Sequence, residues 1–411
     1  MTTIIWFIII FGTIVIVHEF GHYFFAKKSG ILVREFSIGM GPKLFGSRKN
    51  GTAYTLRALP IGGYVRMAGW QDDETTIQPG AQVSLITDDD GVVTRINTSD
   101  KLMLEGGVPL QVSGTDLVKK LTITGYVNGD ESTEVTYPVD HDATVIESDG
   151  TEVQIAPEDV QFQSVSIWRR MLVNFAGPMN NFLLAIVAFF ALALAMGTPS
   201  TSNIIGTVQA NAPAATAGIK SGDRIVAIDG TQTKSFADLQ TQIGKHKPST
   251  IDVKYSRNGK TKTVTVTPKS GMIGITSSTD HGLLNAVKYG FTQPWNIAVQ
   301  IYEALKSMFT GGFSLNKLAG PVGIYTMTSQ ATKGGLYNII WFLASLSVNL
   351  GIMNLLPIPM LDGGKLILNL LELIRRKPLP AEKEGMVTLV GAALVFALMI
   401  AVTINDILRI F

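Results

Sequence analysis

The chain has 411 residues, of which 46% are hydrophobic and 16% are charged, whereas about 25% of residues are charged in a typical soluble domain. This composition excludes a disordered or highly solvated chain and indicates membrane-spanning segments. Residues 71–165 hold 19 acidic and 4 basic residues, while the rest of the chain holds 13 acidic and 30 basic residues. Such an acidic block argues against a nucleic-acid partner. The absence of cysteine excludes a disulfide framework, a thiol nucleophile and any cysteine-ligated metal.

Four apolar segments are long enough to cross a bilayer, since about 20 helical residues cover a hydrocarbon core of ~30 Å. We expect transmembrane helices over residues 1–26, 171–196, 336–364 and 386–404. The first has no basic stretch before it and no small-residue cleavage site after it, so we expect it to be retained rather than removed as a signal peptide. The second and third contain interior Asn and Pro residues, which need protein or water partners in lipid.

Lysine and arginine residues at the ends of these segments predict their orientation. They follow the first segment, precede the second at residues 169–170, and lie between the third and fourth at residues 375–377. Because such residues favour the cytoplasmic side, we expect a multi-pass protein of the cell membrane with both termini extracytoplasmic. Residues 27–170 would then be cytoplasmic, and residues 197–335 extracytoplasmic.

The segments between the spans differ in pattern. Residues 27–80 form a strand-like loop, in which 36–70 read as short strands around a Pro-Ile-Gly-Gly turn. Residues 81–165 form an acidic, β-rich cytoplasmic insertion. Residues 200–278 read as one small α/β domain. Residues 284–310 have the apolar spacing of a core-facing or membrane-surface helix, within an amphipathic helical region over 284–330. The fold class is therefore an α-helical polytopic membrane protein of four transmembrane helices, with a cytoplasmic β-rich segment and an extracytoplasmic α/β domain.

The most specific motif is His18-Glu19-Phe20-Gly21-His22, inside the first span. Positions i and i+4 share one face of a helix, so both imidazoles can hold one Zn²⁺ ion, and Glu19 is placed to take a proton from the attacking water. Ionisable groups within a span are costly and are functional by default. We therefore favour a metal site over a merely polar helix face.

A catalytic zinc site usually has three protein ligands, and Asp362 is the candidate for the third. It lies at the expected cytoplasmic end of the third span, where Pro357 and Pro359 force an extended, non-helical backbone and Gly363-Gly364 permits a sharp turn. The alternative is an aspartate that caps a helix at the membrane edge. The remaining histidines lie in segments expected to be soluble, where surface positions are expected: His141, His246 and His281.

Together these motifs resemble the site-2 protease family of intramembrane zinc metalloproteases, in particular its bacterial RseP/RasP/Eep type. The resemblance rests on HEFGH, on LDGG after NLLPIP and on a PDZ-like segment between them, and GGYVRMAG, GPMNN and LAGPVGIY also fit. It implies His18, His22 and Asp362 as zinc ligands and Glu19 as the catalytic base. It also implies that Asn354 binds the substrate strand or the oxyanion, the alternative being a buried Asn that joins helices.

The resemblance further implies regulated intramembrane proteolysis. A zinc metalloendopeptidase of this type cuts transmembrane segments of single-span substrates after an upstream site-1 protease has trimmed them. The implied substrates are anti-sigma factors, signal-peptide remnants or pheromone precursors. The 27–80 region would be a membrane-associated β-loop, in which residues 54–67 offer an edge to an unwound substrate strand. Residues 200–278 would be a circularly permuted PDZ domain that binds peptide or acts as a size filter.

Two other kinds of protein compete with this interpretation. A membrane scaffold or metal-handling protein could use the His and Asp side chains structurally, but such a site needs no carboxylate between its ligands. A membrane-anchored zinc protease that cuts soluble substrates would take its third ligand from a soluble helix, and Glu35 is the only acid in residues 23–71. The acidic insertion is expected to be a solvated accessory domain, with a docking site for a basic partner as the alternative.

Overall fold

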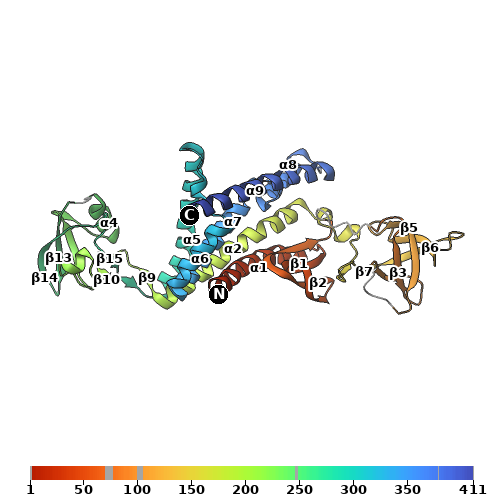
Figure 1. Cartoon of the computed structure of the whole chain (residues 1–411), viewed down its shortest axis with the longest axis horizontal. Coiled ribbons are helices and arrows are strands. Elements are labelled where there is room, and N and C mark those ends of the chain that lie inside the picture. Colours follow the sequence, from red (N-terminus) through yellow and green to blue (C-terminus); the bar gives the residue numbers. More distant parts are fainter. Residues whose placement is uncertain (1, 70–76, 100–104, 246–248, 378, 411) are drawn as a thin grey trace. The chain divides into compact units, whose positions relative to one another are not determined.

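The computed structural model describes residues 2–69, 77–99, 105–245, 249–377 and 379–410. The chain divides into two compact units (Figure 1). The first combines Met1–Ala185 with Asn296–Phe411, and the second is Ile186–Trp295.

In the described part of the chain, four helices are long and apolar enough to cross a membrane, in agreement with the four spans expected from the sequence. Apolar side chains cover much of their outer surface, as a hydrocarbon solvent requires. The helices are α1 (Thr2–Lys28), α2 (Ile167–Met196), α7 (Leu336–Asn354) and α9 (Ala381–Ile410).

The third apolar segment is interrupted before it reaches Asp362. Helix α7 ends at Asn354, residues 355–361 are non-helical, and a separate helix, α8 (Asp362–Arg375), begins at the aspartate. Pro357 and Pro359 cause the interruption because proline disfavours a helical conformation in the residue before it. The expectation that Asp362 lies on non-helical backbone was therefore wrong, because Asp362 is the first residue of α8.

Residues 27–67 contain two long strands rather than several short ones. Strands β1 (Val33–Lys49) and β2 (Thr52–Met67) are bent by bulges, with Gly39 and Gly62 at positive φ. Because of these bends, residues 33–38 pair both with 53–56 and with 63–67. Residues 63–67 pair with 33–38 alone among the described residues, so they form one edge of the β1–β2 sheet.

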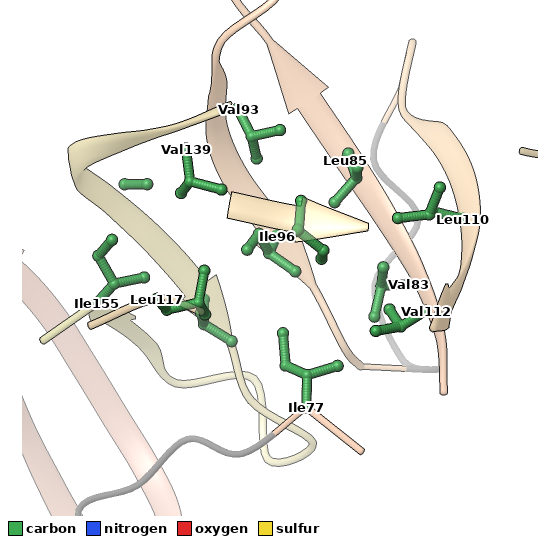
Figure 2. Packing of buried hydrophobic residues seen from close by; sticks show 13 residues of the cluster. Ile77, Val83, Leu85, Val93, Ile96, Leu110, Val112, Leu117, Val139 and Ile155 are labelled. Carbon is green, nitrogen blue, oxygen red and sulfur yellow. The ribbon is translucent and has the colours of Figure 1, made fainter. Parts of the chain in front are cut away.

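The acidic insertion folds into a six-stranded sheet in the order β4-β3-β5-β6-β7-β8, in which β4 also pairs with β7. This extra pairing closes the sheet into a barrel around buried Val, Ile and Leu side chains (Figure 2). The strands are β3 (Gln82–Thr87), β4 (Val93–Asn97), β5 (Val108–Asp116), β6 (Thr122–Val127), β7 (Glu134–Ile146) and β8 (Glu152–Gln154). Two 3-10 turns, η1 (Glu158–Val160) and η2 (Phe162–Ser164), lead on to α2.

The second unit contains a small α/β core, built on a four-stranded sheet in the order β12-β11-β13-β14. Side chains of β13 alternate between buried and exposed, and the buried ones pack against Leu239 and Ile243 of α4. Its elements are β9 (Thr198–Pro199), β10 (Ile205–Val208), α3 (Pro213–Thr216), β11 (Arg224–Ile228), β12 (Thr231–Gln232), α4 (Phe236–Lys245), β13 (Ile251–Arg257), β14 (Lys260–Val266), β15 (Ile275–Ser277) and β16 (Thr279–Asp280).

The region expected as one amphipathic stretch is divided into helices α5 (Leu283–Thr310) and α6 (Pro321–Lys333), with a 3-10 turn η3 (Leu315–Lys317) between them. Helix α6 begins at a proline, whose missing N–H costs nothing in a first turn. The buried Asp406 carboxylate of α9 accepts hydrogen bonds from the Gly320 and Gly323 N–H groups, each at 2.8 Å. Asp406 therefore joins the end of α9 to the start of α6.

Candidate metal centre

Helix α1 places His18 and His22 one turn apart on the same buried face, as the spacing predicts. Their Nε2 atoms lie 3.2 Å apart. Both side chains are more than 90% buried, so no bulk water can satisfy these nitrogens. The two imidazoles therefore present a pair of nitrogens at one point inside the helix assembly.

Asp362 completes this cluster from the other end of the chain. Its Oδ2 atom lies 3.2 Å from His18 Nε2 and 3.4 Å from His22 Nε2. The three donor atoms all lie within 4.8 Å of one another, and all three residues are buried. The structure thus brings together the three residues that the sequence nominated as ligands.

Helix α8 is held in place by a second contact. Arg170 of α2 forms a two-pronged ion pair with Glu372 of α8, with N–O distances of 2.8 and 3.0 Å. Paired guanidinium and carboxylate groups of this kind fix geometry as well as adding energy. This contact joins the C-terminal part of α8 to the start of α2, and α2 packs closely against the histidine-bearing α1.

The Nδ1 atoms of both histidines also have partners, which come from α2. His22 Nδ1 lies 2.8 Å from the Val173 carbonyl oxygen, and a carbonyl can only accept. His22 Nδ1 therefore carries the proton, and Nε2 of the neutral ring keeps a lone pair for a metal. His18 Nδ1 lies 3.2 Å from the side-chain amide of Asn181.

Two glycines allow α1 and α2 to approach closely enough for these contacts. A Cβ atom at Gly21 would overlap the Ala176 carbonyl, and one at Gly177 would overlap the ring of His22 and approach that of His18. Any larger side chain at Gly177 would therefore occupy the space in which the two rings lie. The side-chain amide of Asn180 donates to the Val17 carbonyl at 3.1 Å and fixes the same helix pair.

Glu19 follows His18 and lies against the β1–β2 sheet. An added Cβ atom at Gly63, in the edge segment 63–67, would be 3.6 Å from Glu19 Cγ. The edge of the sheet and the candidate base are therefore in direct proximity. Asn354, the other residue nominated from the sequence, is half-buried as the last residue of α7, and its role stays a prediction.

Reasoning from the sequence assigned no role to Gly177, Asn181 or Ser347. The signal was present, because an Asn inside an uncharged span requires a partner. The partners are His18 for the side chain of Asn181 and the Ser347 hydroxyl, which donates to the Asn181 carbonyl at 2.8 Å. Which partner an interior Asn contacts depends on how α1, α2 and α7 pack, and no local pattern encodes this.

The remaining histidines that the structure describes do not belong to the cluster. His141 is exposed in β7 and pairs with Asp142 and Asp159, whose hydrogen bonds raise the pKa of the imidazole. His281 is exposed beside β16. His246 lies outside the described residues.

The residues of the cluster fit a zinc ion. Two imidazole nitrogens and one carboxylate oxygen are a common catalytic donor set for this metal. The donors converge, the Nδ1 atoms have partners from outside the set, and Gly177 leaves free the space that a Cβ atom would fill. A buried carboxylate together with two histidines on an HExxH helix is typical of zinc metalloproteases.

Comparison with known proteins supports the same class. The family model "Peptidase family M50" matches residues 6–398, and the chain belongs to this family. The chain is 49% identical to the "Probable protease eep" of Enterococcus faecalis over 422 residues, covering 100% of both chains. It is 48% identical to a "Putative zinc metalloprotease" of Lactococcus lactis subsp. lactis, covering 100% of this chain and 99% of that protein.

A solved structure is also similar to part of this chain. The PDZ domain of the SdrC-like protein from Listeria monocytogenes is 25% identical to this chain and matches 20% of this chain and 90% of that domain, with a TM-score of 0.17.

Proposed function

We propose that this zinc metalloprotease cleaves the transmembrane segments of single-span membrane proteins. The observation that carries the proposal is the position of the buried His18, His22 and Asp362 cluster, whose histidines lie in an apolar helix that is long enough to span a membrane. A protease of soluble substrates has no need of a site enclosed by such helices. Regulated intramembrane proteolysis, in which a site-1 protease trims the substrate first, is the corresponding pathway.

We assign His18, His22 and Asp362 as the metal ligands and Glu19 as the catalytic base. Zinc, when bound, supplies Lewis-acid chemistry that polarises the scissile carbonyl and makes water acidic near neutral pH. Glu19 accepts the proton of the attacking water and later passes it to the leaving amine. Asn354 is assigned to hold the substrate strand or the oxyanion.

The segment 63–67 is the edge on which an unwound substrate would form β-sheet hydrogen bonds. A helical substrate shields its amides, so it must first become extended. The support for this assignment is that 63–67 pairs with 33–38 alone among the described residues and that Gly63 lies against Glu19. This narrows the 54–67 segment expected from sequence, because residues 53–56 are paired on both sides, with 33–38 and with 45–48.

The proposed orientation places both termini outside the cell and the metal cluster toward the cytoplasm, with the β1–β2 sheet and the barrel on the cytoplasmic side. The support is the distribution of Lys and Arg residues at the ends of the four helices. Residues 200–278 would then be an extracytoplasmic PDZ domain that admits shortened substrates. The implied substrates are anti-sigma factors, signal-peptide remnants or pheromone precursors.

Substitution of the base tests this function. In liposomes, the wild-type protein should cut a tagged single-span peptide that lacks an outer domain, and the cut should lie within the span. Glu19→Gln should lower the rate by about 10²-fold to 10⁴-fold while zinc content and thermal stability stay unchanged. Equal cleavage by Glu19→Gln, or cleavage only outside the span, would contradict the proposal.

A further inference from the structure

One short segment of the acidic insertion contacts the β1–β2 sheet through charged side chains. This segment, residues 147–154, connects β7 to β8 and includes β8 itself, and we call it the acidic turn. It carries Glu147, Asp149 and Glu152. The metal cluster and its mechanism make no use of these three carboxylates.

Each of the three carboxylates faces a basic side chain of the sheet. Arg66 Nη1 donates to Glu147 Oε1 at 2.7 Å, and Arg57 Nη1 lies 3.3 Å from Asp149 Oδ2. Glu152 has a longer contact with the sheet, 3.8 Å to Arg48, and a shorter ion pair of 3.1 Å with Arg95 of β4. Opposite charges are therefore matched along the whole acidic turn.

Basic side chains of the β1–β2 sheet also donate hydrogen bonds to backbone carbonyls of the acidic turn. Lys43 Nζ donates to the Gly150 carbonyl at 2.7 Å, and Arg34 Nε donates to the Gln154 carbonyl at 2.7 Å. Arg34 is 1% exposed, so its guanidinium is enclosed by this contact. Burial alone would raise the pKa of Asp149, but hydrogen bonds from Thr151 and the charges of Arg57 and Lys43 lower it overall.

One of these arginines connects the acidic turn to the interior of the sheet. Arg57 Nη2 donates to Glu35 Oε1 at 2.8 Å, and the Thr55 hydroxyl donates to the same oxygen at 2.6 Å. Glu35 belongs to the segment 33–38, which pairs with 63–67. A continuous set of contacts therefore runs from Asp149 to the strand beside Glu19.

We propose that the acidic turn is a docking element that fixes the β1–β2 sheet beside the zinc site. The basic partner of the acidic insertion is then this protein's own sheet. Glu147 and Asp149 act as positioning residues, because they act through Arg66 and Arg57 and do not touch the reacting atoms. The docking contact itself is independent of the proposed function, whereas its effect on cleavage rests on that function.

Charge reversal and its rescue test the contact in the full-length protein without substrate. Glu147→Arg places a positive charge against Arg66, so backbone amides of residues 33–67 should exchange hydrogen faster, by about tenfold or more. Combining Glu147→Arg with Arg66→Glu restores opposite charges and should return the exchange rates toward those of the wild type. Amides of the barrel strands β3 and β5 serve as the internal standard.

A matched control is Lys119→Glu. This change breaks an exposed ion pair in which Lys119 Nζ lies 3.7 Å from Glu158 Oε1, and it involves no residue of the β1–β2 sheet. It should leave exchange in residues 33–67 unchanged. If Glu147→Arg unfolds the barrel, the milder Asp149→Asn variant decides the question by the same measurement. Unchanged exchange in 33–67, or no recovery in the double variant, would overturn the proposal.

Cleavage assays then separate docking from the proposed function. In Glu147→Arg, kcat/KM for a single-span peptide should fall and then recover in the double variant, while zinc content stays constant. If exchange responds as expected but the wild type cleaves no membrane segment, the docking contact stands and the proposed function fails. If exchange does not respond while the wild type cleaves normally, only the docking proposal fails.

Discussion

The side-chain amide of Asn181 lies 3.2 Å from Nδ1 of His18, in the middle of two apolar helices. In the observed orientation the amide Nδ2 faces the ring, and Asn181 Oδ1 has no hydrogen-bond partner within the described part of the chain. Rotating the amide by half a turn places Oδ1 against the Nδ1–H group. That orientation satisfies the oxygen and leaves Nε2 of His18 with a lone pair for zinc.

We predict that Asn181→Ala weakens zinc binding by about 10-fold to 100-fold, the usual effect of removing a partner behind a metal-binding histidine. Competition with a chelator in detergent measures this directly, without reference to proteolysis. Asn181→Asp keeps an acceptor for His18 Nδ1 and should retain more affinity than Asn181→Ala. Ser345→Ala, which removes an exposed hydroxyl bonded to its own helix, is the control. Wild-type affinity in Asn181→Ala would show that the amide does not orient His18.

Gly177→Ala should displace both imidazoles, because its Cβ atom would overlap the His22 ring. We expect loss of bound zinc together with a destabilisation of about 1–3 kcal/mol, the usual cost of overpacking. Metal content after purification and thermal unfolding measure the two effects. Gly12→Ala is the matched control, since a Cβ atom there meets no atom within 4 Å. Equal zinc content in the two variants would contradict this account of the site.

Asp406→Ala should destabilise the protein by about 1–3 kcal/mol, because the Gly320 and Gly323 N–H groups lose a buried acceptor. Thermal unfolding of the purified protein tests this prediction. Asn405→Ala, which removes a partly exposed hydrogen bond of 3.1 Å to Asn316 rather than a buried acceptor, should have a much smaller effect. If both variants unfold at the wild-type temperature, the link between α9 and α6 carries no stability.

The second unit should lose stability in acid through Asp223. Burial alone would raise the pKa of this carboxyl, but hydrogen bonds from Arg257 and from the Lys220 N–H lower it overall. Because the folded pKa is depressed, the stabilisation is fully present above the unfolded value of about 3.9 and is lost as pH falls below it. Hydrogen exchange of residues 205–277 between pH 6 and pH 3 measures this.

The control for the pH experiment removes the titrating group. Asp223→Asn should have lower protection at pH 6 and a weaker dependence on pH than the wild type. An identical pH dependence in both proteins would assign the acid sensitivity to other carboxylates.

The sequence was sufficient to nominate the three residues that the structure brings together, because the pattern around each of them is local. His18 and His22 lie at i and i+4, and Asp362 is the acidic residue beside a Pro and Gly break, so their residue types and positions indicated the site. The contacts around them depend on packing between distant segments. The approach of Gly21 to Ala176 sets the register of α1 against α2, and only then does Asn181 reach His18.

The β-rich regions were less predictable for a related reason. Alternation indicated strands in residues 36–70, but the positive φ of Gly39 and Gly62 bends each strand and gives 33–38 two partners. The acidic composition of the insertion could be read from the sequence, whereas the position of its basic partner in the fold could not. Arg66 and Glu147 are 81 residues apart, and their pairing depends on the closed barrel presenting the acidic turn.

The two halves of the metal cluster come from opposite ends of the chain: the histidines lie in its first 22 residues, and Asp362 is within its last 50. A growing polypeptide therefore contains His18 and His22 long before Asp362 has been synthesised. Until α8 has been added, a nascent chain cannot assemble this site. Hydrolytic activity at this cluster therefore requires synthesis to have passed Asp362.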